Sequence, residues 1–349
     1  MQYQYLYSIF FIKFFIVMNS NRLYFLLIIP FFFVICQVLY FPSAIPSHSN
    51  PQIQKSKDQV ATNLILKSTD NGHSWQDISK GLPENIEAGN FFVNDKGLYM
   101  PAGVEMYHSK SKSVGPIWEK EIFKKDPGTI TVCKSGMYAF TYNGNISRKI
   151  AGSNTWSLIY ENFPSKNLRS IFETSSGAVL IGCDSGLFKF TNKGKTWQHV
   201  RKDGWVIKIV ESKGVLIATD QNGIIRSNDD GQTWNLVVSE GGVGIDVTSI
   251  SSGFAVITYN TDSKTRRVRA SVDGGKTWQP IDADLPAHDL IANILQVGDN
   301  FFCGHPKGIF RSIDRGKTWQ LILPSIGTKV FNLSRMGKVI YAFPKNGGC

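Results

Sequence analysis

Residues 312–319 read S-I-D-R-G-K-T-W, and residues 271–278, which lie 41 positions earlier, read S-V-D-G-G-K-T-W. The same pattern, S-x-D-x-G-x-[ST]-W, occurs at residues 68–75 and 227–234. A shorter copy without the aspartate occupies residues 191–197. A pattern that recurs within one chain predicts a repeat protein in which every copy belongs to one structural unit.

Two further copies are degenerate but keep their tryptophan, at residues 109–118 and 147–156. With them, seven tryptophans follow one another at intervals of 37 to 44 residues, at positions 75, 118, 156, 197, 234, 278 and 319. A period of about 40 residues is typical of the four-stranded blades of a β-propeller. The seven copies therefore predict seven blades.

Each unit has the pattern of four short strands. In one unit, apolar runs at residues 168–173, 178–183, 187–191 and 196–200 are separated by short segments rich in Gly, Asn, Asp and Ser. Runs of β-branched and aromatic residues between such turns are typical of antiparallel hairpins. No segment beyond residue 60 shows a convincing helical period, so we expect an all-β domain.

The two ends of the chain complement each other. After Trp319 there is room for only two strands, at residues 329–334 and 338–343, whereas residues 63–68 resemble the third strand of the other units. We therefore predict a seven-bladed β-propeller of four-stranded antiparallel blades over residues 61–349, with the last blade closed by N-terminal strands. Such closure removes the open sheet edges that promote aggregation.

The N-terminal part of the chain is strongly apolar. Residues 23–41 contain no charge, and Arg22 precedes them. About 20 apolar residues in a helix span the hydrocarbon core of a membrane, and a flanking arginine favours the cytoplasmic side. We predict a signal or transmembrane anchor helix in residues 1–45 and a linker in residues 46–60, with Met1 and Met18 both open as the start. The propeller is then exported, either anchored and facing the periplasm or outside, or secreted.

The residue types of the repeated octapeptide suit a structural turn. Ser and Asp side chains can bond nearby backbone groups, and Gly tolerates a positive φ. Trp buries a large area and needs a partner for its N–H. No activated nucleophile or acid pair is present in it. We therefore expect a structural role for Ser68, Asp70, Gly72, Trp75, Trp197, Ser227, Asp229, Gly231, Trp234, Ser271, Asp273, Gly275, Trp278, Ser312, Asp314, Gly316 and Trp319.

The composition limits the partners. The net charge of +11 favours an anionic partner such as a protein or an acidic glycan, and predicted export argues against nucleic acid. The five cysteines are far apart and the six histidines are scattered, so we expect no metal and no cofactor. We also expect a monomeric propeller that contacts the membrane only through its N-terminal helix.

Ligand binding is expected on one face of the ring. Strands alternate in direction, so the loops between second and third strands share a face with the loops between blades, and the repeated turns lie on the other face. The candidate ligand-binding residues on the first face are Asp184, Arg201, Asp220, Arg266, Arg267, His305 and Lys307. Arg266 and Arg267 belong to a basic segment, residues 259–269, that we expect to form the longest of these loops and to bind an acidic group.

The octapeptides SIDRGKTW, SVDGGKTW and SNDDGQTW resemble the Asp-box, or bacterial neuraminidase repeat. The resemblance covers roughly residues 61–349. Among Asp-box proteins, the chain most resembles the photosystem II stability/assembly factor group of propellers. It implies a sialidase superfamily-like fold. The Arg-Ile-Pro motif that sialidases carry near their start is absent.

Two functions follow from this reading. The first is a non-catalytic, exported binding or assembly scaffold that uses one propeller face to bind a protein or acidic ligand. The second is a sialidase-like glycoside hydrolase. Most glycoside hydrolases need two suitably spaced carboxyl groups, whereas sialidases use a tyrosine nucleophile. Asp184 and Asp220 hold equivalent positions in adjacent units and are the candidate carboxylates.

Overall fold

The computed structural model describes residues 63–84, 86, 91–94, 97–110, 117–122, 129–141, 144–150, 153, 155–165, 167–191 and 196–346. The predicted anchor helix and linker, together with Cys36 and Cys349, lie outside these residues. Within the described part of the chain, no helix has the length and apolar character needed to cross a membrane.

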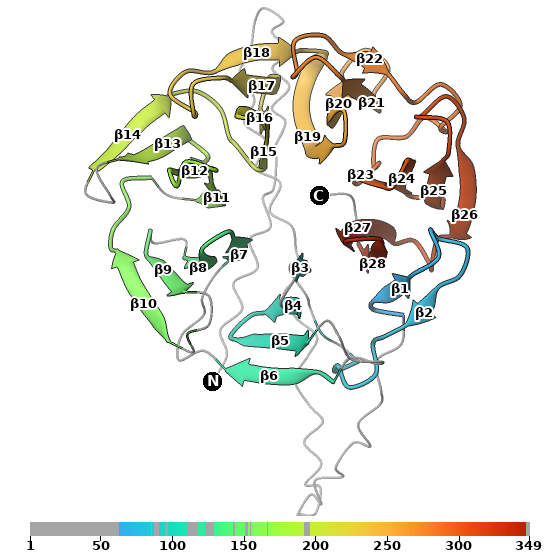
Figure 1. The fold of residues 1–349 in the computed structure, drawn as a ribbon, viewed down its shortest axis with the longest axis horizontal. Coiled ribbons are helices and arrows are strands. Elements are labelled where there is room, and N and C mark those ends of the chain that lie inside the picture. Colours follow the sequence, from blue (N-terminus) through green and yellow to red (C-terminus); the bar gives the residue numbers. More distant parts are fainter. Residues whose placement is uncertain are drawn as a thin grey trace, which may run out of the picture. The chain divides into compact units, whose positions relative to one another are not determined.

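The described residues form seven four-stranded antiparallel sheets, arranged as the blades of a ring (Figure 1). Six blades each use one continuous stretch of chain, with the first strand innermost. Blade 1 comprises β3 (Phe92–Asn94), β4 (Gly97–Ala102), β5 (Glu105–Lys110) and β6 (Glu119–Ile122). Blade 2 comprises β7 (Thr129–Cys133), β8 (Gly136–Phe140), β9 (Ile146–Ile150) and β10 (Trp156–Tyr160). Blade 3 comprises β11 (Leu168–Glu173), β12 (Val179–Cys183), β13 (Gly186–Thr191) and β14 (Thr196–Arg201).

The next three blades have the same strand order. Blade 4 comprises β15 (Ile209–Ser212), β16 (Val215–Asp220), β17 (Gly223–Ser227) and β18 (Asn235–Val238). Blade 5 comprises β19 (Gly241–Ile250), β20 (Gly253–Asn260), β21 (Thr265–Ser271) and β22 (Gln279–Pro280). Blade 6 comprises β23 (Ile294–Val297), β24 (Asn300–His305), β25 (Gly308–Ser312) and β26 (Gln320–Pro324).

Blade 7 combines the two ends of the described chain. Its strands, from the inside outward, are β27 (Val330–Met336), β28 (Val339–Lys345), β1 (Leu66–Ser68) and β2 (Gln76–Asp77). In the pairing of β1 with β28, Lys67 lies opposite Tyr341. The innermost strand β27 contacts β23 on one side and β3 on the other, so blade 7 completes the ring.

The core consists of apolar layers between neighbouring blades. Between blades 3 and 4, for example, Leu180 and Leu187 pack with Leu216, Ala218 and Ile225, and all five are fully or almost fully buried. Burying a leucine or isoleucine side chain contributes about 1.5–3 kcal/mol. Cys183 and Cys303 lie in similar layers as buried free thiols, as their apolar sequence context indicates.

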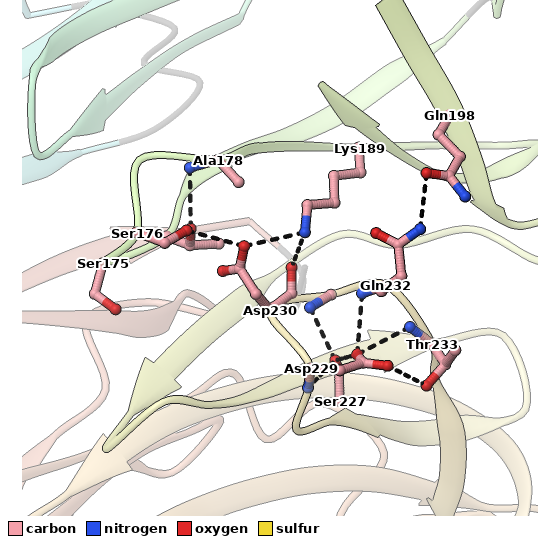
Figure 2. A network of polar contacts seen from close by, with 12 residues as sticks. Ser175, Ser176, Ala178, Lys189, Gln198, Ser227, Asp229, Asp230, Gln232 and Thr233 are labelled. Carbon is pink, nitrogen blue, oxygen red and sulfur yellow. Dashed lines mark hydrogen bonds and ion pairs between the residues drawn. The ribbon is translucent and has the colours of Figure 1, made fainter. Parts of the chain in front are cut away.

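The four complete octapeptides form loops between the third and fourth strands of their blades and share one hydrogen-bond pattern, drawn for blade 4 in Figure 2. There, Ser227 Oγ donates to Asp229 Oδ1 (2.7 Å) and accepts from Gly231 N (2.9 Å). Asp229 also accepts from Thr233 N (2.9 Å) and Thr233 Oγ1 (2.6 Å). The loops that begin at Ser68, Ser271 and Ser312 repeat these contacts.

Burial alone would raise the pKa of Asp229, but the hydrogen bonds from Thr233, Ser227 and Gln232 outweigh it and lower the pKa to about 2. Gly231 has a φ of 80°, in the region that favours glycine. The loop is therefore held by an ionised carboxylate and by a backbone conformation that few other residues adopt.

Each of three interfaces has a further hydrogen bond that crosses from one blade to the loop of the next. Lys189 Nζ donates to the carbonyl of Asp230 (2.7 Å) and contacts its carboxylate (3.0 Å), as Figure 2 shows. Arg226 Nε donates to the carbonyl of Gly274 (2.8 Å), and an Arg311 guanidinium nitrogen donates to that of Asn71 (3.1 Å). All three acceptors are the fourth residue of an octapeptide, so the bases join neighbouring blades at equivalent points.

The tryptophans do not all find the polar partner that their indole N–H was expected to need. Trp234 Nε1 donates to Gly231 O (3.0 Å) and Trp319 Nε1 to Ile281 O (2.8 Å). The indole nitrogens of Trp75 and Trp278 are buried without a hydrogen-bond partner among the described residues. Packing of the ring, rather than a shared hydrogen bond, is therefore what these positions have in common.

Candidate functional site

The face opposite the octapeptide loops carries most of the predicted binding residues. Adjacent antiparallel strands reverse direction, so the turns after β12, β16, β20 and β24 share this face with the segments that join one blade to the next. We call it the connection face.

Asp184 lies in the turn between β12 and β13 and is half-exposed. Its carboxylate accepts hydrogen bonds from Arg169 Nε and from Asn167 Nδ2 (2.8 Å). Partial burial would raise the pKa of Asp184, but the bonds from Arg169 and Asn167 outweigh it and lower the pKa. Asp184 therefore remains ionised at neutral pH and anchors an arginine.

Trp205 extends this cluster toward blade 4. The Arg169 guanidinium lies 5.2 Å from the centre of the Trp205 ring, in a cation–π arrangement. The Trp205 indole nitrogen is buried and has no partner among the described residues. Next to it, the apolar side chain of Ile207 is 39% exposed.

Asp220 and Arg201 form the adjoining pair. Arg201 Nε lies 2.7 Å from Asp220 Oδ2, and Asn222 N donates to Asp220 Oδ1 (3.0 Å). Gly204 packs closely here, since a Cβ at this position would lie 3.2 Å from Asp220 Oδ2. The chain from Arg201 to Trp205 therefore passes over Asp220 and leads to Arg169 and Asp184.

The basic segment at residues 259–269 differs from its prediction as a long loop. It is mostly strand, because β20 ends at Asn260 and β21 begins at Thr265, which leaves a turn of residues 261–264. Full-length pairing of these two strands, with Tyr259 opposite Arg266, brings the arginines into the sheet. The segment contains the bases Lys264, Arg266, Arg267 and Arg269, and of these only Lys264 lies in the turn.

Acidic groups and carbonyls of the same chain bind the three arginines of β21. Arg267 forms a two-point contact with Asp282 (2.8 and 3.2 Å), and Arg269 Nε donates to Glu240 Oε1 (2.7 Å). Arg266 is buried and donates to the carbonyl of Ile291 (2.6 Å). An acidic ligand at this place would reach the exposed part of Arg267, whereas Arg266 faces the interior.

His305 is buried beneath the connection face. Lys307 N donates to its Nδ1 (3.0 Å), and its Nε2 lies 2.9 Å from Pro286 O, an arrangement that suits the neutral ring with the proton on Nε2. Burial lowers the pKa of His305 to about 4, although the contact with Pro286 opposes this. Lys307 itself is exposed at the turn. His305 is thus placed to hold the turn, and Lys307 to meet a partner.

The predicted residues fall into two groups. Asp184, Arg201 and Asp220 belong to one continuous cluster across blades 3 and 4, whereas Arg266, Arg267, His305 and Lys307 surround the connection between blades 5 and 6. Sequence reasoning missed Arg169, Trp205 and Lys208. Trp205 carried a signal, because it is the only one of eight tryptophans outside the seven repeats.

Three ion pairs of the connection face share an orientation, whereas Arg169 and Asp184 are about equally exposed (38% and 36%). Lys208 Nζ lies 2.5 Å from Asp246 Oδ1, and their side chains are 44% and 5% exposed. In the pair of Arg267 with Asp282, the side chains are 39% and 7% exposed. In the pair of Arg201 with Asp220, they are 20% and 0% exposed. The base is nearer to solvent than the acid in each case, so the carboxylates lie underneath and the face presents cationic groups to a partner.

Among the residues described, no group of three or more His, Cys, Asp or Glu side chains is arranged to hold a metal ion. The three cysteines in that part of the chain, Cys133, Cys183 and Cys303, are free thiols.

Comparison with known proteins gives similarity in structure only. No protein-family model matches the sequence, and no curated protein matches it. Similar solved structures include YCF48 bound to D1 peptide (TM-score 0.52, 11% identity, 75% of this chain and 95% of that one). YCF48 from Cyanidioschyzon merolae has a TM-score of 0.53 at 13% identity, covering 73% and 93% of the two chains.

A third similar structure is the extracellular domain of BT4673 from B. thetaiotaomicron (TM-score 0.55, 14% identity). The match covers 70% of this chain and 35% of that one, so this chain corresponds to about a third of the BT4673 domain. At such low identities the likeness concerns the fold. Together with the seven sheets, it identifies the described part of the chain as a seven-bladed β-propeller.

Proposed function

We propose that this protein is an exported, non-catalytic binding or assembly scaffold whose connection face binds an acidic segment of a partner protein. The observation that carries the proposal is the common orientation of the ion pairs made by Lys208, Arg201 and Arg267, with bases toward solvent and acids beneath. An acidic segment meets Lys208 and Arg267 in positions already fixed by buried carboxylates, which reduces the ordering cost of binding. Arg169 is held in the same way by the half-exposed Asp184. Ile207 and the ring of Trp205 offer apolar area beside these charges.

Two similar structures support parts of this proposal. YCF48 has been solved with a D1 peptide, which is a precedent for peptide binding by a propeller of this size. The BT4673 domain is extracellular, which agrees with export directed by the uncharged segment at residues 23–41. We propose that this segment is an anchor or signal, that the propeller acts as a monomer, and that the octapeptide loops serve the fold rather than the ligand.

The glycosidase alternative receives less support from the geometry. A general acid needs a raised pKa, but the pKa of Asp184 is lowered and Arg169 already binds its carboxylate. Asp220 is fully buried against Arg201. Hydrolysis of a fluorogenic sialoside by the full chain, lost on Asp184→Asn or Asp220→Asn, would contradict the scaffold proposal.

The direct test is selection of random displayed peptides on the full chain. We expect enrichment of acidic peptides that contain an aromatic or aliphatic residue. Affinity should fall about tenfold on Lys208→Gln or Trp205→Ala, since a charged hydrogen bond or a stacked side chain contributes about 1.4 kcal/mol or more. Arg335→Gln is the matched control, because Arg335 is exposed near the end of β27 that leads to the opposite face. Equal losses in control and test variants would refute the proposal.

A further inference from the structure

At four interfaces the octapeptide loop packs into the space between its own blade and the preceding one. Gly316 of blade 6 illustrates this, because a Cβ there would lie 2.5 Å from Cβ of Ile281, just after blade 5. Gly231 of blade 4 packs in the same way against Leu180 of blade 3. The serine seven residues before the tryptophan anchors these loops and is at most 2% exposed, at Ser68, Ser227, Ser271 and Ser312.

The interface between blades 1 and 2 is built differently. Lys149 pairs with Trp156 across β9 and β10 and lies seven residues before it, so Lys149 takes the place of the anchoring serine. Its ammonium group lies 3.0 Å from Glu121 of blade 1, and the side chain of Lys149 is only 12% exposed. Among the described residues, the buried apolar cluster at this interface consists of Met106, Ile130 and Ala139.

A cavity of about 820 Å³ lies at this interface. Its apolar walls include Phe92, Val93, Met106, Val132 and Met137, which come from four strands of the two blades. Lys149 and Glu121 form a polar part of the lining, and Lys134 and His108 belong to the lining as well. Sites for small organic ligands typically have volumes of about 300–1,000 Å³ and combine apolar walls with a few polar groups.

The charges indicate which ligand suits this cavity. Its lining contains two lysines and one carboxylate, and Lys149 and the indole N–H of Trp156 (3.4 Å) already bind that carboxylate, Glu121. One positive charge therefore remains for an anion. Methionine side chains are flexible and polarizable, so Met106 and Met137 can adapt to an aromatic or aliphatic body.

We propose that the cavity between blades 1 and 2 is a binding site for an amphipathic organic anion, with the apolar body against Met106 and Met137 and the anionic group toward Lys134. This site is separate from the connection face and does not depend on the function proposed for it. A buried serine anchors the loop at four other interfaces, and Lys149 stands at that position at the interface where the cavity occurs.

Two fluorescent probes that differ by one charged group test the proposal on the full chain. They are 8-anilino-1-naphthalenesulfonate and its uncharged counterpart N-phenyl-1-naphthylamine. We expect one saturable site for the sulfonate per chain, and binding of the uncharged probe about tenfold weaker, because a charged contact contributes about 1.4 kcal/mol or more. Absence of saturable binding, or equal affinity for both probes, would overturn the proposal.

Variants locate the bound probe. Met137→Trp places a larger ring on the apolar wall of the cavity and should weaken binding of both probes, whereas Ile159→Trp adds the same ring to the exposed side of β10 and should leave binding unchanged. Lys134→Gln removes the positive charge that Glu121 does not already bind, and it should reduce sulfonate affinity about tenfold with little effect on the neutral probe. Sulfonate binding that persists unchanged in Lys134→Gln would also refute the site, whether or not Met137→Trp folds.

Discussion

Replacing Arg226 by methionine removes one inter-blade hydrogen bond and keeps most of the apolar length of the side chain. In the native protein, Arg226 Nε donates to the carbonyl of Gly274 at 2.8 Å, which joins blade 4 to the loop of blade 5. The side chain also packs near Gly275, where a Cβ would lie 3.5 Å from Cδ of Arg226. Methionine preserves that contact, so the variant isolates the polar interaction.

The expected loss follows from the environment of the bond. Hydrogen bonds that involve a charged group contribute about 1.5–3 kcal/mol net. Arg226 is only partly buried, so water can replace some of the interaction, and we expect a loss of about 1 kcal/mol in the free energy of unfolding. With a urea m-value of about 3 kcal/mol/M, the unfolding midpoint should fall by about 0.3 M at unchanged slope.

Urea denaturation followed by tryptophan fluorescence measures this shift. Lys189→Met and Arg311→Met should produce similar losses, and the three should add to within about 0.5 kcal/mol because they act at separate interfaces. Arg335→Met is the control, since Arg335 is exposed on β27. If Arg226→Met behaves like the control, or if the three losses fail to add, the bases do not join the blades independently.

Three further predictions concern the loops and the buried histidine. Ser312→Ala leaves the buried N–H of Gly316 without its acceptor and should destabilise the protein by about 2 kcal/mol in thermal or urea unfolding, whereas Ser263→Ala at an exposed turn should change stability by less than about 0.5 kcal/mol. The folded pKa of Asp229, about 2, lies below its unfolded value near 3.9, so its stabilising effect is complete above about pH 4 and is lost as the pH falls toward 2. Asp229→Asn should therefore make the urea midpoint depend less steeply on pH across that range. A pH dependence identical to that of the wild type would exclude this carboxylate as a cause of the acid-induced loss of stability. The pKa of His305, about 4, likewise lies below its unfolded value near 6.5, so the unfolded state again binds the extra proton and stability should decrease from pH 6.5 to pH 4. His305→Gln should remove that component, and unchanged pH dependence would show that His305 does not contribute.

The sequence alone was sufficient for the number and type of blades. Seven tryptophans at intervals near 40 residues specify seven units, and apolar runs separated by Gly, Asn and Asp specify antiparallel strands. The local chemistry of the loops was also readable, because the hydrogen bonds among Ser227, Asp229 and Gly231 join residues at most four positions apart. Interactions of this kind are encoded within one short segment.

The sites could be predicted only in part. Asp184 and Asp220 were found because their positions recur in adjacent units, and Arg201 because it lies in a segment between blades. The partners of the two carboxylates differ: Arg169 for Asp184, and Arg201 for Asp220. The base that binds each carboxylate cannot be predicted from a short segment, because the two residues of each pair are 15 or more positions apart in the sequence. The basic segment at residues 259–269 shows the same limit, since its charge was evident but its pairing with Glu240 and Asp282 was not.

Sequence periodicity thus determined the architecture of this protein, because each blade repeats the same short-range pattern of burial and turns. Tertiary structure decided which charges reach solvent: Lys208 and Asp246 are equally polar in the sequence, yet one is half-exposed and the other is buried between blades. It also placed Lys149 at the position of a serine and left a cavity beside it. These properties arise from contacts between blades, where residues distant in the chain compete for the same space.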